Sequence, residues 1–248
     1  MQNTATAEIE VDEAATMAAR YGVVRERVAR AARAAGRGAE DVTLIAVSKT
    51  HPVAVLREAL AAGVAEFGEN RVQEAADKRA ELAGDIERNP VRWHLIGNLQ
   101  ANKARRAVQI FDVIHTLDSA TLALRLDRIC GEEGRATLPV LIQVELGGET
   151  TKAGVTESEL PEIVEAVRAC SRLELAGLMT LPPYFEDAEA VRPYFRRLRE
   201  LRDEMRDCEA FGTKRGELSM GMSHDFEIAI AEGSTMVRVG TAIFGARG

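Results

Sequence analysis

The sequence predicts a single α/β domain built as a (β/α)8 barrel of the TIM type. Short β-branched or aromatic segments alternate with longer segments rich in Ala, Leu, Glu and Arg, and eight such short segments occur. The length of 248 residues is typical of one barrel. Alternating strands and helices imply a parallel sheet, and eight strands favour a closed barrel over an open doubly wound sheet.

The predicted strands are rich in β-branched and aliphatic residues, and a helical stretch separates each from the next. They cover residues 42–48, 65–68, 92–96, 113–116, 140–145, 175–179, 217–220 and 236–239. A long leading helix is expected over residues 12–35, before the helix-breaking Gly36 and Gly38.

One domain is expected over residues 1–248, because no Pro- or Ser-rich linker and no low-complexity segment interrupts the alternation. The acidic segment 1–11 is expected to lack ordered structure. Only residues 240–248 follow the last predicted strand, too few for a full outer helix or a C-terminal β-domain. We therefore expect the leading helix to fill the eighth outer position.

The composition excludes several classes of function. A net charge of −7 and a pI near 5.3 leave no excess of basic groups to neutralise nucleic-acid phosphates. No segment approaches the ~20 apolar residues of a membrane-spanning helix, and the first residues lack the pattern of a secretory signal. The three cysteines are odd in number and widely spaced, which argues against a disulfide framework and favours the cytoplasm.

Lys49 directly follows the first predicted strand, at the end of the barrel where active sites of this fold lie. Partial desolvation at this rim increases the fraction of the free amine, the form that attacks carbonyl carbons. The alternative, which the residue alone favours, is a strand-end lysine whose ammonium extends into water.

Arg238 lies within the last predicted strand, where its side chain shares one face with that of Met236. Because burial of an unpaired charge is very unfavourable, Arg238 points to solvent, pairs with a core carboxylate, or donates to a bound ligand. The residues alone leave the core ion pair and the ligand role equally open.

Two loops near the end of the sequence form a predicted anion site. Gly240 and Thr241 follow the last strand and begin a short helical turn, where backbone N–H groups converge on an anion. The loop after the seventh strand, which contains Met222 and Ser223, is expected to be the second wall of this site. The Ser223 hydroxyl binds a phosphate or, alternatively, caps the helix that follows.

Asn70 follows the second strand and is expected within reach of the same barrel mouth, although helix capping is the more common role for such a residue. The four histidines lack the spacing of a metal site, so packing or surface roles are expected and no metal is predicted. The sequence has neither a G-x-S-x-G nucleophile elbow nor a Walker P-loop, which disfavours serine hydrolases and nucleotide hydrolases.

Six motifs, in their order along the chain, resemble the pyridoxal phosphate homeostasis protein family. They are AVSKTHP around Lys49, FGENRVQE around Asn70, WHLIGNLQANK from Trp93, GLMT from Gly177, SMGMSHD from Ser219 and VRVGTAIFG from Val237. The resemblance covers nearly the whole chain after about residue 20. It implies a fold-type III barrel related to the N-terminal domain of alanine racemase, with pyridoxal 5'-phosphate (PLP) held as a Schiff base on the first-strand lysine.

Carried over motif by motif, the resemblance assigns that lysine to Lys49 and places Asn70 near the hydroxyl side of the cofactor ring. Arg238 would face the pyridine nitrogen, Ser219 would support the Arg238 guanidinium, and Met222 would line the site. The phosphate is assigned to three residues of the last two loops: Ser223, Gly240 and Thr241.

The resemblance further implies a role in PLP (vitamin B6) homeostasis without robust catalysis. An arginine that faces the ring nitrogen keeps this nitrogen unprotonated and makes the ring a poor electron sink. Racemases of this fold use a second base from a C-terminal domain that is not expected here, and Tyr184 is the tyrosine expected nearest the mouth. The alternatives are a low-activity PLP-dependent amino-acid racemase and a phosphate-binding barrel without PLP. We expect a monomer that binds PLP, with amino acids and PLP-dependent apo-enzymes as transient partners.

Overall fold

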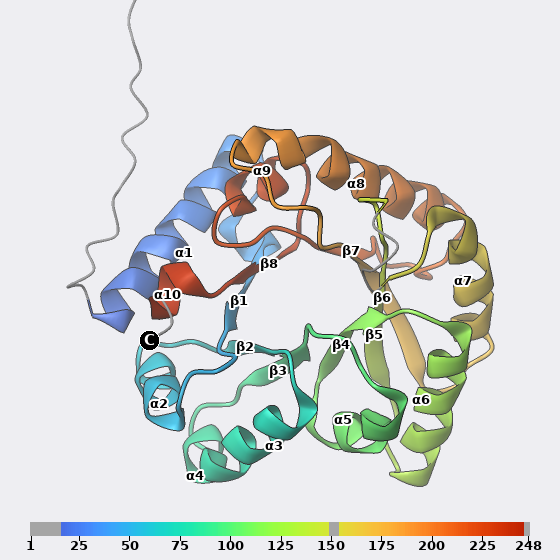
Figure 1. Cartoon of the computed structure of the whole chain (residues 1–248), viewed down its shortest axis with the longest axis horizontal. Helices are drawn as coiled ribbons and strands as arrows, with labels where there is room; N and C mark the ends of the chain where they lie inside the picture. Colours follow the sequence, from blue (N-terminus) through green and yellow to red (C-terminus); the bar gives the residue numbers. More distant parts are fainter. Residues whose placement is uncertain (1–15, 149–153, 246–248) are drawn as a thin grey trace, which may run out of the picture.

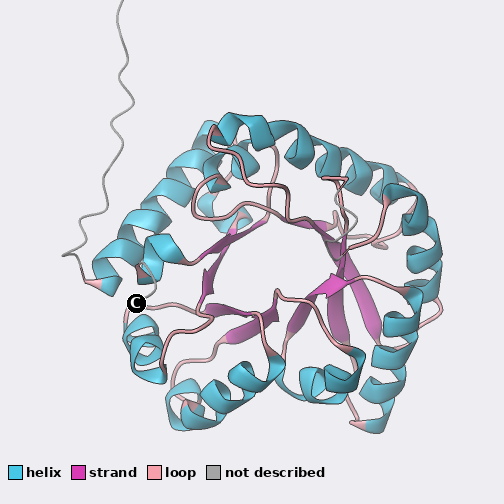
Figure 2. Ribbon diagram, viewed as in Figure 1, coloured by secondary structure: helices cyan, strands magenta, loops and turns pink. Residues whose placement is uncertain are grey.

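The computed structural model describes residues 16–148 and 154–245, which form one closed barrel of parallel strands surrounded by helices (Figure 1; Figure 2). The eight strands follow one another around the barrel in chain order, and β1 pairs with β8 to close it. This confirms the predicted (β/α)8 fold. The expectation for residues 1–11 falls outside the described residues.

The strands are β1 Thr43–Val47, β2 Glu66–Glu69, β3 Arg92–Leu95, β4 Val113–Leu117, β5 Leu138–Gln143, β6 Leu173–Met179, β7 Glu217–Ser219 and β8 Met236–Val239. Each overlaps the strand predicted at its place, because β-branched and aliphatic residues mark the buried segments well.

The α-helices are α1 Met17–Ala34, α2 Val53–Ala61, α3 Val72–Glu81, α4 Ala83–Ile86, α5 Ala104–Ile110, α6 Ala120–Glu132, α7 Leu160–Arg168, α8 Arg192–Asp207, α9 Phe226–Ala231 and α10 Thr241–Phe244. Short 3-10 helices occupy Ala39–Asp41, Ala101–Lys103, Glu157–Glu159 and Ala188–Val191. None of the helices in the described ranges combines the length and the apolar character needed to cross a membrane.

Helix α1 takes the eighth outer position, beside α9 and α10 (Figure 1). It begins at Thr16, whose side chain accepts a hydrogen bond from the Ala19 N–H, and it buries one apolar face against the barrel. Polar contacts hold α1 to both helices. Arg20 Nε donates to the Ile243 carbonyl of α10 at 2.8 Å, and Arg27 pairs with Glu227 of α9 at 2.7 Å. The chain thus joins its first helix to its last two.

The barrel interior contains an apolar layer, with polar side chains nearer the carboxyl ends of the strands. The apolar layer is formed by Ile45, Val113, Leu141, Met179 and Met236. Two residues further along β4 and β8, and therefore on the same inward face, lie His115 and Arg238. The predicted shared face of Met236 and Arg238 is thus the interior of the barrel.

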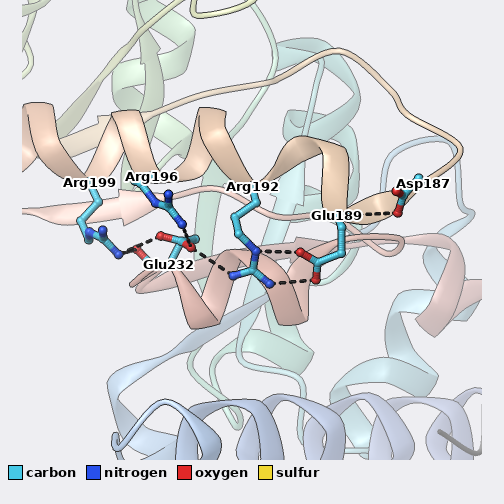
Figure 3. Close-up of polar contacts among 6 residues, drawn as sticks. All are labelled: Asp187, Glu189, Arg192, Arg196, Arg199 and Glu232. Atoms are coloured by element: carbon cyan, nitrogen blue, oxygen red, sulfur yellow. Dashed lines mark hydrogen bonds and ion pairs between the residues drawn. The ribbon is translucent and has the colours of Figure 1, made fainter. Parts of the chain in front are cut away.

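Three arginines of α8 converge on Glu232, the residue that ends α9 (Figure 3). Glu232 lies 3.0 Å from Arg192, 3.3 Å from Arg196 and 2.8 Å from Arg199. These three ion pairs tie α8 to the end of α9. Burial opposes ionisation of Glu232, but hydrogen bonds from Arg196 and Arg192 outweigh it and hold the pKa of this carboxyl below its ordinary value.

Replacing Glu232 with Gln should lower the free energy of unfolding by about 1–2 kcal/mol at pH 7, since the three guanidiniums are partly solvated and regain water. A lowered folded-state pKa contributes stability above the unfolded pKa of about 4.3, and this contribution is lost as the pH falls through the folded value. The gap between wild type and variant, measured by urea unfolding, should therefore close in acid. Glu189→Gln, at a more exposed partner of Arg192, is the control; an equal effect of both variants would contradict the prediction.

Candidate functional site

The eight predicted site residues lie at the carboxyl ends of four neighbouring strands, β7, β8, β1 and β2. In chain order they are Lys49 after β1, Asn70 after β2, Ser219 at the end of β7, Met222 and Ser223 after β7, Arg238 within β8, and Gly240 and Thr241 after β8. The sequence thus predicted residues that the closed barrel gathers on one side of its mouth, although they lie far apart in the chain.

Lys49 lies in a turn two residues beyond the end of β1, and its side chain is half-buried. Ser48 before it is fully buried, and Thr50 after it adopts a φ of 67°, which is uncommon for a residue with a branched side chain. The Thr50 N–H donates to Glu74 Oε1 of α3 at 2.5 Å. The Lys49 side chain thus extends from a tight turn that a hydrogen bond to α3 holds in place.

A buried group of charges supports this turn from outside the barrel. We call it the Lys78 cluster: Ser48, Glu69, Glu74 and Lys78. The Lys78 ammonium donates to the Ser48 carbonyl at 2.8 Å, to Glu69 Oε1 at 2.7 Å and to Glu74 Oε1 at 2.6 Å. The Ser48 hydroxyl also donates to Glu69 Oε1, at 2.7 Å. Burial raises the pKa of Glu69, and Lys78 and Ser48 oppose that rise. This cluster could not be predicted from the sequence, because its members come from the end of β1, from β2 and from α3.

Arg238 is buried in the barrel interior with neutral hydrogen-bond partners. One terminal nitrogen donates to Ser219 Oγ at 2.6 Å, and the other donates to the Thr180 carbonyl at 2.9 Å. Burial lowers the pKa of Arg238 to about 10, against the attraction of Asp225, so the guanidinium still carries its charge at pH 7. Within residues 16–148 and 154–245 no carboxylate forms an ion pair with it. Of the three possibilities open from the sequence, the solvent-directed side chain is therefore wrong and the described residues supply no core ion pair.

Two histidines extend this polar interior, and sequence reasoning missed them as partners. His115 Nδ1 lies 2.8 Å from Ser219 Oγ, and His115 Nε2 lies 2.9 Å from His94 Nδ1. His94 Nε2 lies 2.6 Å from Glu66 Oε2. Burial, with the nearby His94 and Arg238, holds the pKa of His115 well below its ordinary value. Their signal in the sequence was an inward-facing polar residue in each of two consecutive predicted strands.

The β7 and β8 loops contact each other through Ser223. Its Oγ accepts hydrogen bonds from the backbone N–H groups of Gly240 at 3.3 Å and Ala242 at 3.5 Å. The N-cap position of α9 belongs to Asp225, so Ser223 does not take the capping role that the sequence left open. The exposed Met222 is held at this turn by its N–H, which donates to Asp225 Oδ1 at 2.6 Å.

Asn70 lines a cavity of about 320 Å³ at the carboxyl ends of the strands, a size within the range of small-molecule sites. The other lining residues are Ile96, Gly97, Asn98, Gln143, Val144, Glu145, Leu181 and Pro182. A Cβ at position 97 would lie 2.4 Å from the Asn70 carbonyl, so the two backbones need glycine there. Arg71, and not Asn70, is the N-cap residue of α3. Two larger hollows, of about 840 and 680 Å³, open at the amino ends of the strands and contain none of the predicted site residues.

Tyr184 is 76% exposed, and its ring centroid lies 5.4 Å from that of His224, next to Ser223. It thus stands over the β7 loop at the rim of the mouth. Among the described residues, no group of three or more His, Cys, Asp or Glu side chains could hold a metal ion.

A family model and several curated relatives match nearly the whole chain. The family model described as the alanine racemase N-terminal domain matches residues 20–248. A pyridoxal phosphate homeostasis protein of Aquifex aeolicus is 44% identical over 228 residues, which are 92% of this chain and 97% of the relative. The protein of the same name from Pseudomonas aeruginosa is 44% identical over 235 residues, which are 94% of this chain and 96% of the relative.

Solved structures similar to this chain include members of the same family. PipY of Synechococcus elongatus without PLP is 42% identical, with a TM-score of 0.81 over 93% of this chain and 100% of its own. PipY with PLP bound gives a TM-score of 0.77 at 41% identity over the same shares. The alanine racemase of Clostridium difficile, 18% identical with a TM-score of 0.64, shares the fold over 92% of this chain and 56% of its own. The chain belongs to the pyridoxal phosphate homeostasis protein family, within the larger group built on the alanine racemase N-terminal barrel.

Proposed function

We propose that this chain binds PLP covalently, as a Schiff base on Lys49, and acts in intracellular PLP homeostasis without robust catalysis. The observation that carries the proposal is the donor set at one side of the barrel mouth. It combines an amine in a constrained turn with a buried guanidinium whose partners are neutral and with a loop pair rich in backbone N–H groups. These donors match the aldehyde, the ring nitrogen and the phosphate of PLP. A PLP-bound structure of PipY supports the match.

Each residue then has a distinct task. The Lys49 amine would condense with the cofactor aldehyde with loss of water, and Asn70 would lie near the ring hydroxyl. Arg238 donates to the ring nitrogen, with Ser219 and the Thr180 carbonyl fixing the plane of its guanidinium. The phosphate would be held by the β7 and β8 loops, through Ser223, Gly240 and Thr241, with Met222 lining the site.

Weak catalysis follows from the same residues. PLP supplies an electron-withdrawing ring, and protonation of its nitrogen strengthens that property. Arg238 keeps its own protons near pH 7, because even the lowered pKa of about 10 lies well above this pH. It therefore offers a hydrogen bond without giving up a proton. The arrangement favours holding PLP over turning over amino acids.

The Lys49 assignment is tested by reduction with borohydride. Reduction should fix one pyridoxyl group on the protein, and peptide mass spectrometry should find it on Lys49. Lys49→Ala should abolish the adduct and the visible absorption band of bound PLP. Lys103→Ala removes another lysine near Asn70 and should keep both. An adduct of unchanged yield in Lys49→Ala would refute the assignment, and no adduct in wild type would favour a phosphate-binding barrel without PLP.

The second candidate is a low-activity amino-acid racemase, favoured by the place of Tyr184 at the rim. Exchange of the Cα hydrogen with solvent deuterium separates the two functions. We expect this hydrogen to exchange slowly in each of a panel of amino acids. Rapid exchange that depends on both Lys49 and Tyr184 would establish the racemase. We further propose a cytoplasmic monomer that exchanges PLP with apo-enzymes, which agrees with the unpaired Cys130, Cys170 and Cys208.

A further inference from the structure

A continuous series of hydrogen bonds crosses the barrel interior from its amino end to Arg238. We call it the interior chain: Glu66, His94, His115, Ser219 and Arg238. Its four contacts measure 2.6, 2.9, 2.8 and 2.6 Å in that order. Both imidazoles and Ser219 are fully buried, so water does not compete for these bonds. Neither the predicted cofactor contacts nor the barrel packing requires such a chain.

The two ends of the interior chain fix its direction. Arg238 has only donors, so Ser219 Oγ accepts from it and turns its own proton toward His115 Nδ1. At the other end, an ionised Glu66 only accepts, so His94 Nε2 carries a proton and donates. With two neutral imidazoles, His115 then donates from Nε2 to His94 Nδ1. One arrangement of protons satisfies every contact.

Glu66 is the part of the interior chain that meets solvent. Its side chain is 22% exposed, and it lines the hollow of about 840 Å³ at the amino ends of the strands, opposite the predicted cofactor site. Arg92 Nη1 lies 3.9 Å from Glu66 Oε1. The interior chain thus connects a carboxyl group on one face of the barrel to a guanidinium near the other.

We propose that the interior chain positions the Arg238 guanidinium against the ring nitrogen of PLP, with Glu66 as the terminal acceptor that agrees with the direction set by Arg238. This inference rests on the proposed PLP site. If the Ser219 proton pointed at Arg238, two donors would face each other and the guanidinium would lose one of its two anchors. The chain excludes that state. Glu66, His94 and His115 are positioning residues, because none of them needs to touch the cofactor.

The first test needs no cofactor. Two-bond ¹H–¹⁵N correlation spectra of the PLP-free protein should show both His94 and His115 neutral and protonated at Nε2. In Glu66→Gln, which keeps the size of the side chain, the ring signals of His115 should shift as well as those of His94. A proton on His115 Nδ1 in wild type, or His115 signals unchanged by Glu66→Gln, would overturn the inference.

The second test measures PLP retention. Glu66→Gln should raise the dissociation constant several-fold, and His115→Phe about tenfold, with a shift of the bound absorption band in both. Glu174→Gln, at another glutamate near the amino end of a strand, is the matched control and should change neither. If His115→Phe fails to fold, the Glu66→Gln variant, whose side chain is partly exposed, is sufficient for the test. Unchanged affinity and spectrum in Glu66→Gln would refute the positioning role. Failure of borohydride trapping in wild type would instead refute the PLP site. The spectra of the PLP-free protein would then still test the interior chain.

Discussion

Replacing Lys78 with Met should lower the free energy of unfolding by about 3–5 kcal/mol, because the change leaves Glu69 buried without its cation. Glu69 is fully buried, and its Oε2 has no hydrogen-bond partner among the described residues, so little else compensates the charge. Without Lys78 the folded-state pKa of Glu69 should rise further above its unfolded value. The penalty should therefore grow as the pH increases above about 4.3. Urea unfolding at several pH values measures it.

The matched rescue is Lys78→Met combined with Glu69→Gln, which removes the unpaired charge and keeps an acceptor for the Ser48 hydroxyl. The double variant should be more stable than Lys78→Met alone, and its stability should depend less on pH. It should also trap PLP on Lys49 less completely than wild type, since the Ser48 carbonyl loses its donor. If the single variant lost under about 1 kcal/mol, the Lys78 cluster would not be the support of this turn that its geometry indicates.

Replacing Gly177 with Ala should lower the free energy of unfolding by about 3 kcal/mol or more. A Cβ at this position of β6 would lie 2.1 Å from the Glu217 carbonyl oxygen and 2.5 Å from its nitrogen. Both are backbone atoms of the adjacent strand β7, so no side-chain movement relieves the clash. Because Thr180 and Ser219 follow on these same strands and bind Arg238, PLP retention should fall together with stability.

Gly22→Ala is the matched control for Gly177→Ala. Gly22 lies inside α1, and nothing comes within 4 Å of a Cβ built there. The same substitution should therefore raise the free energy of unfolding by about 0.5–1 kcal/mol, because alanine favours the helix. Thermal and urea unfolding compare the two variants. Similar effects at both positions would show that β6 and β7 separate easily.

The strands could be predicted from the sequence because buried parallel strands require runs of β-branched and aliphatic residues. The ends of those strands in turn located Lys49 and Arg238, since every parallel strand ends at the same mouth. The partners of these two residues could not be predicted. Whether His94 meets His115 depends on the register of β3 against β4, and a single residue of shift would separate them.

Lys78 shows a second limit of sequence reasoning. It lies in a helix rich in charged residues, where a solvated position is the ordinary expectation for a lysine. Its burial arises only when α3 packs over the end of β1 and carries the ammonium to the Ser48 carbonyl. Similarly, the sequence does not show which backbone atoms lie against a glycine such as Gly177. Such contacts depend on the tertiary arrangement and produce no periodic pattern in the sequence.

The joining of α1 to α9 and α10 has a consequence for how the protein is made. Arg20 and the Ile243 carbonyl, which bind each other, are separated by 223 positions in the chain. During synthesis, α1 emerges long before α9 and α10 exist, and the part of its apolar face that packs on them has no native surface to cover until then. Closure of the ring must therefore wait until α9, β8 and α10 have been synthesised. Until then the nascent chain exposes the apolar face of α1. We therefore expect the folding yield of the protein, far more than its final stability, to depend on chaperones.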